Sequence, residues 1–188
     1  GVGAIGITVK DMNRSVKFYE DVLGFKKISD NEFNGKAYET LNNLFGLNIR
    51  VVKMQLGDEF IELTDYLTAG GRSIPEDQKA NDLFFQHIAI VVIDMDKAFQ
   101  QLKKFSVEYV STAPQTLPVT NAAAAGIKAF YFHDIDDHNL ELIYFPKGKG
   151  NPKWQTSHGK IFLGIDHTAI GVSSTEISQK FYQDILGI

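Results

Sequence analysis

Residues 15–25 read SVKFYEDVLGF, and residues 178–188 read SQKFYQDILGI. Seven of the eleven positions are identical, at an offset of 163 residues (178 minus 15). Half of that offset is close to 80, so a diverged copy is expected between them. Residues 86–92 (QHIAIVV) indeed align with residues 166–172 (DHTAIGV) at an offset of 80, and FIELT at 60–64 aligns with NLELI at 139–143 at an offset of 79. The chain is therefore predicted to repeat one module in tandem.

The copies share one order of elements. Each begins with a β-branched run that predicts a strand, followed by an Asp or Ser that can cap a helix and then by an amphipathic stretch. The first strands are expected at residues 5–9, 87–93 and 167–172, and the helix caps at Asp11, Asp94 and Ser174. Further strands are expected at residues 25–29, 37–41, 49–56 and 59–64 in the first copy, and at 107–111, 127–133 and 139–145 in the second. The predicted module is thus β-α-β-β-β.

Polar stretches rich in Gly and Pro separate the copies and predict the domain boundaries. The expected order is a first module at residues 1–66, a linker at 67–84, a second module at 85–146, a linker at 147–160 and the start of a third module at 161–188. The chain opens without Met and stops after a helix where a strand should follow, so it is expected to be a piece of a longer polypeptide. The cytoplasm is the default localisation, with a removed upstream targeting segment left open.

The composition of the chain limits which kinds of molecule it is expected to bind. The 188 residues are 44% apolar and 22% charged, with a net charge of -4 and no cysteine. No basic stripe is present for nucleic acid and no apolar run is long enough to span a membrane, so neither partner is expected. Without cysteine, any metal site must use His, Asp or Glu. A small-molecule substrate is the expected ligand.

Two phrases carry a family resemblance. The helix phrase F-Y-x-D-x-L-G occurs at residues 18–24 and again at 181–187. Residues 132–142 (FHDIDDHNLEL) are similar to a family segment F-x-D-P-D-G-N-x-x-E-x, with Ile135 in place of Pro and His138-Asn139 around the usual Gly. The chain resembles the vicinal oxygen chelate superfamily, which includes glyoxalases, bleomycin resistance proteins and extradiol dioxygenases. The resemblance implies an α+β fold in which modules pair into an open, cup-shaped mixed sheet with helices outside.

The resemblance also implies metal ligands on the first and last strands of each module. Position by position, it assigns Glu62, His87 and Glu141 as ligands, with His167 of the third copy as an alternative. The fourth position is Ala4, which has no donor atom. The implied cofactor is a divalent metal ion (Ni, Zn, Mn or Fe), and Glu62 and Glu141 are the implied catalytic carboxylates. By contrast, the turn with His133, His138 and three Asp residues is interpreted as a solvated hairpin, with a second metal site as the alternative.

Three functions stay open at this point. The first is a metal-dependent enzyme acting on a molecule with vicinal oxygens, either by isomerisation of the lactoylglutathione lyase type or by ring-cleaving dioxygenation. The second is a metal-free cup that binds a small molecule or an antibiotic, and the third is a non-catalytic module pair of a larger dioxygenase. Convergence of Glu62, His87 and Glu141 on one point would favour the metal enzyme. Because a single third copy lacks a partner, a homodimer is also expected.

Overall fold

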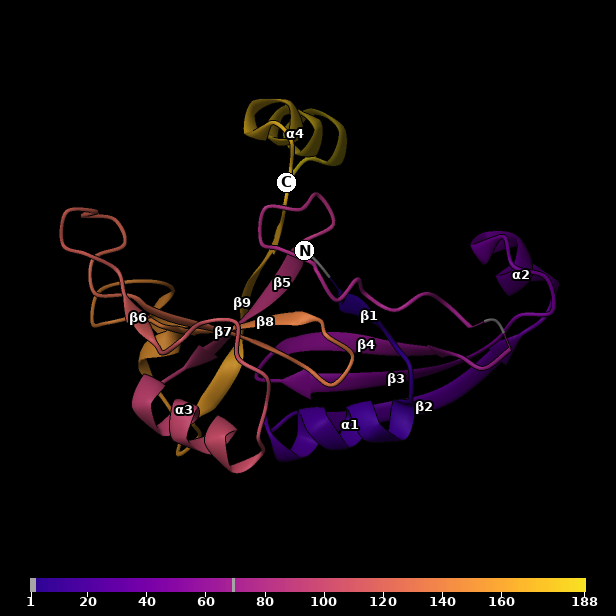
Figure 1. The fold of residues 1–188 in the computed structure, drawn as a ribbon, viewed down its shortest axis with the longest axis horizontal. Coiled ribbons are helices and arrows are strands. Elements are labelled where there is room, and N and C mark those ends of the chain that lie inside the picture. The colour runs from indigo at the N-terminus through magenta and orange to yellow at the C-terminus, as the bar shows by residue number, and fades with distance from the viewer. Residues whose placement is uncertain (1–2, 69) are drawn as a thin grey trace.

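A computed structural model describes residues 3–68 and 70–188, and it shows two open mixed sheets with few helices (Figure 1). The first sheet has the order β1-β4-β3-β2, built from β1 (Ile5–Val9), β4 (Glu59–Tyr66), β3 (Asn48–Leu56) and β2 (Lys26–Asn34). Residues 1–2 of the first expected module and residue 69 of the first expected linker lie outside the described residues. The predicted α+β class is confirmed, and the described residues form no closed barrel.

The second sheet combines two copies of the repeat. Its order is β6-β7-β8-β5-β9, built from β6 (Gln115–Thr116), β7 (Lys128–His133), β8 (Asn139–Tyr144), β5 (Gln86–Val92) and β9 (Phe162–Ile170). The first and last strands of a copy pair in parallel in both sheets, β1 with β4 and β5 with β8. The strand β9 of the third copy lies antiparallel to β5, so the third copy supplies the edge of the second sheet.

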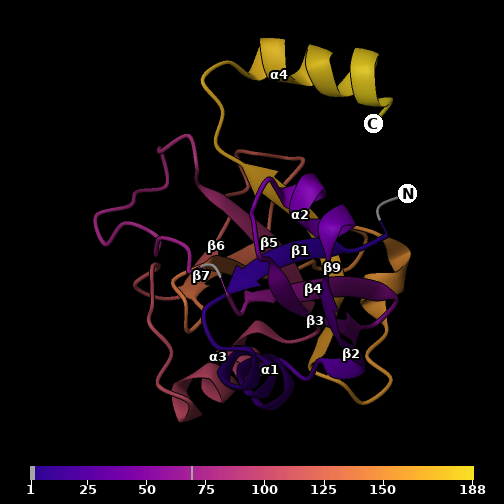
Figure 2. The same cartoon turned by 90° about the vertical axis from the view of Figure 1, so that its right-hand side faces the viewer.

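Two helices cover the same side of the molecule. Figures 1 and 2 both show α1 (Met12–Asp21) and α3 (Met95–Lys104) side by side against the two sheets. Their first turns are capped as predicted, because Asp11 Oδ1 accepts the Arg14 amide at 3.1 Å and Asp94 Oδ1 accepts the Lys97 amide at 3.0 Å. Tyr19 and side chains from both sheets meet in one continuous apolar core. The two sheets therefore share their main source of stability.

The third copy continues beyond the sheet as an arm. After β9 the chain leads into α4 (Thr175–Phe181) and η2 (Tyr182–Leu186), which Figures 1 and 2 place on the opposite side from α1 and α3. The predicted cap is confirmed here too, since Ser174 Oγ accepts the Ile177 amide at 3.4 Å. None of the described helices is long and apolar enough to cross a membrane.

A short segment supports β9 from the side away from α3. The turn η1 (Pro152–Gln155) presses Trp154 against β9, where the indole Nε1 donates to Asp166 Oδ1 at 2.7 Å. A Cβ on Gly164 would lie 2.9 Å from the Trp154 ring, so only glycine allows this approach. Trp154 joins Ala89, Val91 and their neighbours in a second, smaller apolar cluster.

Three strand predictions were wrong in detail. Residues 37–41 lie in the helix α2 (Lys36–Asn42) rather than in a strand, because Gly35 turns the chain out of β2 with φ of 97° and the following residues include good helix formers. Residues 107–111 form only an isolated bridge between Tyr109 and Phe132, since Val110 and Ser111 both direct their amides to one carbonyl, that of Tyr131. The first strand of the third copy begins at Phe162, five residues before the predicted start at 167.

Candidate metal centre

One row of residues crosses the second sheet and defines the candidate site. Tyr131 on β7 pairs with Glu141 on β8, Glu141 pairs with Ala89 on β5, and Ala89 pairs with His167 on β9. Residues opposite one another in a sheet project from the same face, and so do residues two apart on one strand. His87, two residues before Ala89, therefore shares this face with Glu141 and His167.

The three candidate ligands converge around one carboxylate oxygen. His87 Nε2 lies 3.1 Å from Glu141 Oε2, and His167 Nε2 lies 3.6 Å from the same oxygen. One ligand atom from each of the three residues lies within 4.8 Å of the others. The His87 and Glu141 side chains are buried, at 8% and 6% exposed, whereas His167 is 40% exposed. The cluster is therefore enclosed on the sheet side and open to solvent on the side of the arm.

The pKa of each titratable group in the cluster depends on its neighbours. Burial raises the pKa of Glu141, but the nearby imidazoles of His167 and His87 outweigh it and leave the pKa below its usual range. The Glu141 carboxylate, 3.6 Å from Nε2, raises the pKa of His167 to about 9 with help from Asp166. Burial beside the Glu141 carboxylate raises the pKa of Tyr131 to about 12, so the phenol keeps its proton at neutral pH. A carboxylate anion is thus held among groups that can donate to it.

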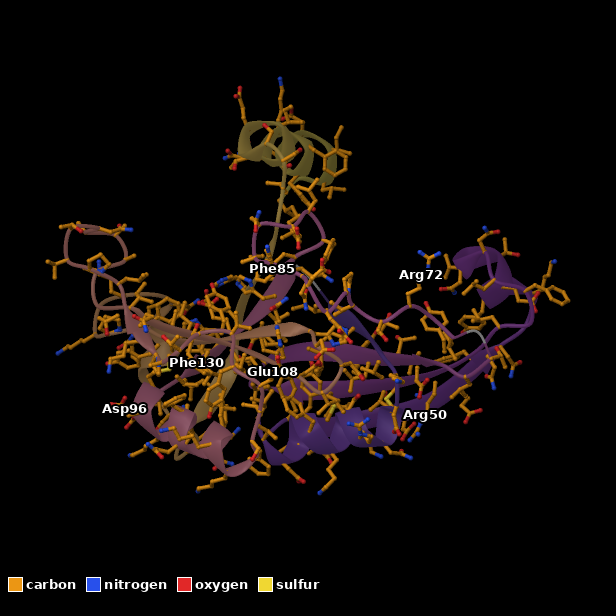
Figure 3. All side chains as sticks on the ribbon, in the orientation of Figure 1. Arg50, Arg72, Phe85, Asp96, Glu108 and Phe130 are labelled. Atoms are coloured by element: carbon orange, nitrogen blue, oxygen red, sulfur yellow. The ribbon has the colours of Figure 1, made fainter. Side chains whose placement is uncertain are left out.

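The His87 ring is buried without a hydrogen bond. Neither of its nitrogens has a hydrogen-bonding partner among the described residues, and the 3.1 Å approach of Nε2 to Glu141 does not have the direction of one. Its other neighbours are rings, Tyr131 with a centroid separation of 5.1 Å and Phe85 with 5.7 Å. Figure 3 shows Phe85 near the base of the arm. A buried imidazole without a partner is costly, and a metal ion on its lone pair would remove that cost.

The first copy does not contribute to this cluster. Glu62 lies on β4 with its side chain 44% exposed, and Lys53 Nζ is 3.8 Å from its carboxylate. The register explains the absence of a matching histidine, because Gly6 faces Glu62 as Ala89 faces Glu141. Two residues before Gly6 stands Ala4, at the position of His87. The structure therefore brings together His87, Glu141 and His167 and leaves Glu62 outside.

Two residues beside Glu141, His167 and Tyr131, were not among the main candidates predicted from the sequence. His167 entered only as an alternative, because nothing in the sequence shows that β9 pairs with β5. Tyr131 was not selected, although its place opposite Glu141 follows once β7 and β8 are paired in register. The repeat of His87 as His167, 80 residues later, was the sequence signal that linked the two histidines that lie together in the structure.

A cleft of about 970 Å³ lies beside the cluster, between β1, the 70–74 segment and the 135–140 turn. His87 and Thr168 line it, but Glu141 and His167 do not. Its walls are apolar at Ile5, Ile7 and Ile135 and carry Arg14 and Arg72 at the rim, the latter labelled in Figure 3. The buried side chains of His87 and Glu141 belong to the histidine–carboxylate cluster rather than to the centre of the cleft.

Comparison with known proteins agrees with this architecture. A family model described as Glyoxalase/Bleomycin resistance protein/Dioxygenase superfamily matches residues 1–142. Glyoxalase I of Saccharomyces cerevisiae is 26% identical over 199 aligned positions, covering 97% of this chain and 55% of the yeast protein. The chain therefore spans about half the length of this curated relative.

Solved structures share the fold at low sequence identity. A glyoxalase family protein from Bacillus cereus is 18% identical with a TM-score of 0.64, covering 76% of this chain and 92% of that one. A point mutant of glyoxalase I from Zea mays is 18% identical with a TM-score of 0.63, covering 98% of this chain and 54% of that one. The fosfomycin resistance protein FosX from Listeria monocytogenes, solved with Mn(II) and sulfate, is 18% identical with a TM-score of 0.50, covering 79% of this chain and 95% of that one.

Proposed function

The chain belongs to the Glyoxalase/Bleomycin resistance protein/Dioxygenase superfamily, and from this premise we propose that it binds a divalent metal ion and acts on a small molecule with two adjacent oxygens. The observation that carries the proposal is the convergence of His87, Glu141 and His167 on one point of the second sheet. The proposed ligands come from the second and third copies, and Glu62 is not among them.

The donor set suits such an ion. Two imidazoles and one carboxylate are ligands for Zn, Ni, Mn or Fe, and three protein ligands leave positions free for substrate oxygens. When bound, the ion would act as a Lewis acid toward those oxygens. The buried His87 ring supports this use of the site, because none of the described residues gives its nitrogens a hydrogen-bonding partner.

Neighbouring residues would orient the ligands. Asp166 Oδ2 lies 3.0 Å from His167 Nδ1, which fixes the proton on that nitrogen, so Nε2 would be the nitrogen that binds the ion after it releases its own proton. Tyr131 stays protonated beside Glu141 and holds the carboxylate from the other side. Both roles are those of positioning residues, which keep the ligand atoms directed at one point.

Isomerisation of the glyoxalase I type is the first candidate reaction. The similarity to yeast glyoxalase I extends over 97% of the chain, which favours this reaction over others of the superfamily. Of the two carboxylates that the family resemblance implies, Glu62 and Glu141, only Glu141 lies in the cluster. In this proposal the movement of a substrate proton therefore falls to Glu141.

Ring-cleaving dioxygenation is the second candidate. One observation favours it, since two histidines and one carboxylate match the set that non-haem Fe(II) oxygenases use. The metal-free binding cup remains a third candidate, because the cleft beside His87 is large and partly apolar.

The metal content of the purified protein tests the proposal. We expect a bound transition metal in the wild type, and the loss of one equivalent in His87→Ala and in Glu141→Gln, measured by inductively coupled plasma mass spectrometry. Glu62→Gln is the matched control and should keep the metal, because Glu62 lies outside the cluster. Absence of metal even after incubation with excess divalent ions would exclude the metal enzyme and favour the binding cup.

Activity then separates the two reactions. Turnover of the hemithioacetal of glutathione with a 2-oxoaldehyde, supported by Zn or Ni, would identify the isomerase. Oxygen consumption with a catechol, supported only by Fe(II), would identify the dioxygenase. Each activity should fall by at least about 10²-fold in Glu141→Gln, the size of effect expected for losing a positioned acid–base group.

A further inference from the structure

A second group of possible ligands lies away from the centre described above. Glu108 follows α3, His133 ends β7, and Asp137 sits in the turn that leads into β8. One ligand atom from each of the three lies within 4.8 Å of the others. The His133 amide donates to the Glu108 carbonyl at 2.9 Å, which holds these two residues face to face. Figure 3 shows Glu108 on the segment after α3.

The His133 ring is fixed in a form suited to binding a cation. Its Nε2 lies 3.1 Å from Asn139 Oδ1, and the Asn139 amide donates in turn to Gln78 Oε1 at 3.3 Å. An amide oxygen only accepts, so Nε2 carries the proton and the lone pair of a neutral ring is on Nδ1. This Nδ1 is buried, has no hydrogen-bonding partner among the described residues, and lies 3.8 Å from Glu108 Oε1.

A cation bound here would lie beside the Nδ1 lone pair and the Glu108 carboxylate, with one ligand atom from each of Glu108, His133 and Asp137 within 4.8 Å of the others. Ligating histidines in metal sites commonly donate their other N–H to an oxygen, as His133 does to Asn139. The Glu108 side chain is 72% exposed, so the site is accessible from solvent. One nitrogen and two carboxylates are a donor set for zinc-like ions, with water able to complete the coordination.

The other acidic residues of this turn, Asp134 and Asp136, already accept hydrogen bonds. Asp134 is held by Tyr19 Oη at 3.0 Å and by His138 Nδ1 at 2.9 Å. Asp136 Oδ2 accepts the Lys10 amide of the first copy at 3.0 Å. Gln78 Nε2 donates to the backbone carbonyl of Asp137 at 3.0 Å. Among the described residues, the Asp137 carboxylate takes part in none of these hydrogen bonds.

We propose that Glu108, His133 and Asp137 form a second divalent-cation site, distinct from the cluster around Glu141. A cation there would fasten the 134–139 turn to the segment after α3. That turn borders the cleft and contacts the first copy through Lys10, so the ion would stiffen one wall of the cleft. The proposal replaces the sequence-based interpretation of this turn as a solvated hairpin.

Competitive titration of the metal-stripped protein with Zn²⁺, against a chromophoric chelator, tests the second site. We expect two equivalents bound by the wild type and one by His133→Ala. We expect one also by His87→Ala, and none by the double variant. Glu108→Gln, an exposed change that leaves the fold intact, should weaken one of the two equivalents at least ten-fold. The control Glu20→Gln alters an exposed carboxylate on α1 and should bind as the wild type does.

The outcomes separate the two metal sites. If His133→Ala and Glu108→Gln both titrate like the wild type, the second site does not exist. If instead His87→Ala titrates like the wild type while His133→Ala loses one equivalent, the second site stands and the proposed centre at Glu141 fails. Near-UV circular dichroism of His133→Ala must match the wild type, and Glu108→Gln decides the question if it does not.

Discussion

The pairing of Asp30 with Arg50 shows how a single residue ties two strands together in a pH-dependent way. Arg50 Nε and Nη2 each reach one oxygen of Asp30 at 2.8 Å, a two-point contact between β3 and β2. Hydrogen bonding to Arg50 lowers the pKa of Asp30 from 3.8 to about 2. A carboxyl whose pKa is lower in the folded state stabilises the protein above the unfolded value and loses that effect as pH falls toward the folded value.

Asp30→Asn should therefore destabilise the protein at neutral pH, but only slightly. Both side chains are partly exposed, at 24% for Arg50 and 28% for Asp30, so screening by solvent limits the loss in free energy of unfolding to less than about 1 kcal/mol at pH 7. The difference from wild type should shrink as pH falls from about 4 to about 2. Urea unfolding at several pH values measures it, with Glu32→Gln on the same strand as control. A difference that grew on acidification would contradict the assigned pairing.

Among the secondary-structure elements, β9 decides whether the candidate centre is complete. It carries His167, and its position depends on the Trp154 indole, which packs on Gly164 and donates to Asp166 at 2.7 Å. Asp166 in turn orients the His167 ring. A second contact comes from the first copy. Glu59 Oε2, at the start of β4, accepts the Ile165 amide at 3.2 Å and so also holds β9.

Trp154→Ala should lower stability and metal affinity together. Removing a buried tryptophan costs about 3–5 kcal/mol, and the loss of support for β9 would leave His167 free to move. We expect thermal unfolding at a lower temperature and a weaker metal equivalent at the Glu141 cluster. The second equivalent, at His133, should be unchanged. Trp154→Phe keeps most of the packing and serves as control, and equal metal binding in Trp154→Ala and wild type would show that β9 does not depend on this contact.

For the whole molecule, the arm carries an apolar surface that the described residues leave open. Ile177, Phe181 and Ile185 on α4 and η2 are all exposed, whereas the equivalent helices α1 and α3 are packed on a sheet. A contiguous apolar surface of this kind favours association. The homodimer expected from the repeat remains a prediction, and this surface gives it a location.

Self-association should depend on this surface. Multi-angle light scattering after size-exclusion chromatography should show a shift from monomer to dimer with rising protein concentration. The variant Ile177→Lys with Ile185→Lys should stay monomeric, because lysine on both positions makes association unfavourable. The control Lys180→Glu changes charge on the same helix without removing apolar surface. A wild type that remains monomeric up to about 100 µM would be inconsistent with this role for the arm.

Much of the fold could be predicted because each copy of the repeat contains local sequence patterns typical of strands, caps and helices. The caps at Asp11 and Asp94 follow from residue spacing within one copy. The α+β class was implied by the family resemblance, and the parallel pairing of β1 with β4 is seen only in the structure. Helix α2 escaped prediction because a short segment with mixed propensities takes its form from Gly35 and its surroundings. The division into three modules stays a prediction, since the second sheet joins two of them.

Part of the candidate site could be predicted from the sequence, and the rest required the tertiary structure. The sequence alone selected His87 and Glu141, since both stand at positions that recur with the repeat. Only the tertiary structure decided that His167 joins them and Glu62 does not, because that depends on which strand pairs with β5. Pairing between strands that begin 76 residues apart (162 minus 86) depends on packing of the whole sheet, and no pattern within either strand encodes it.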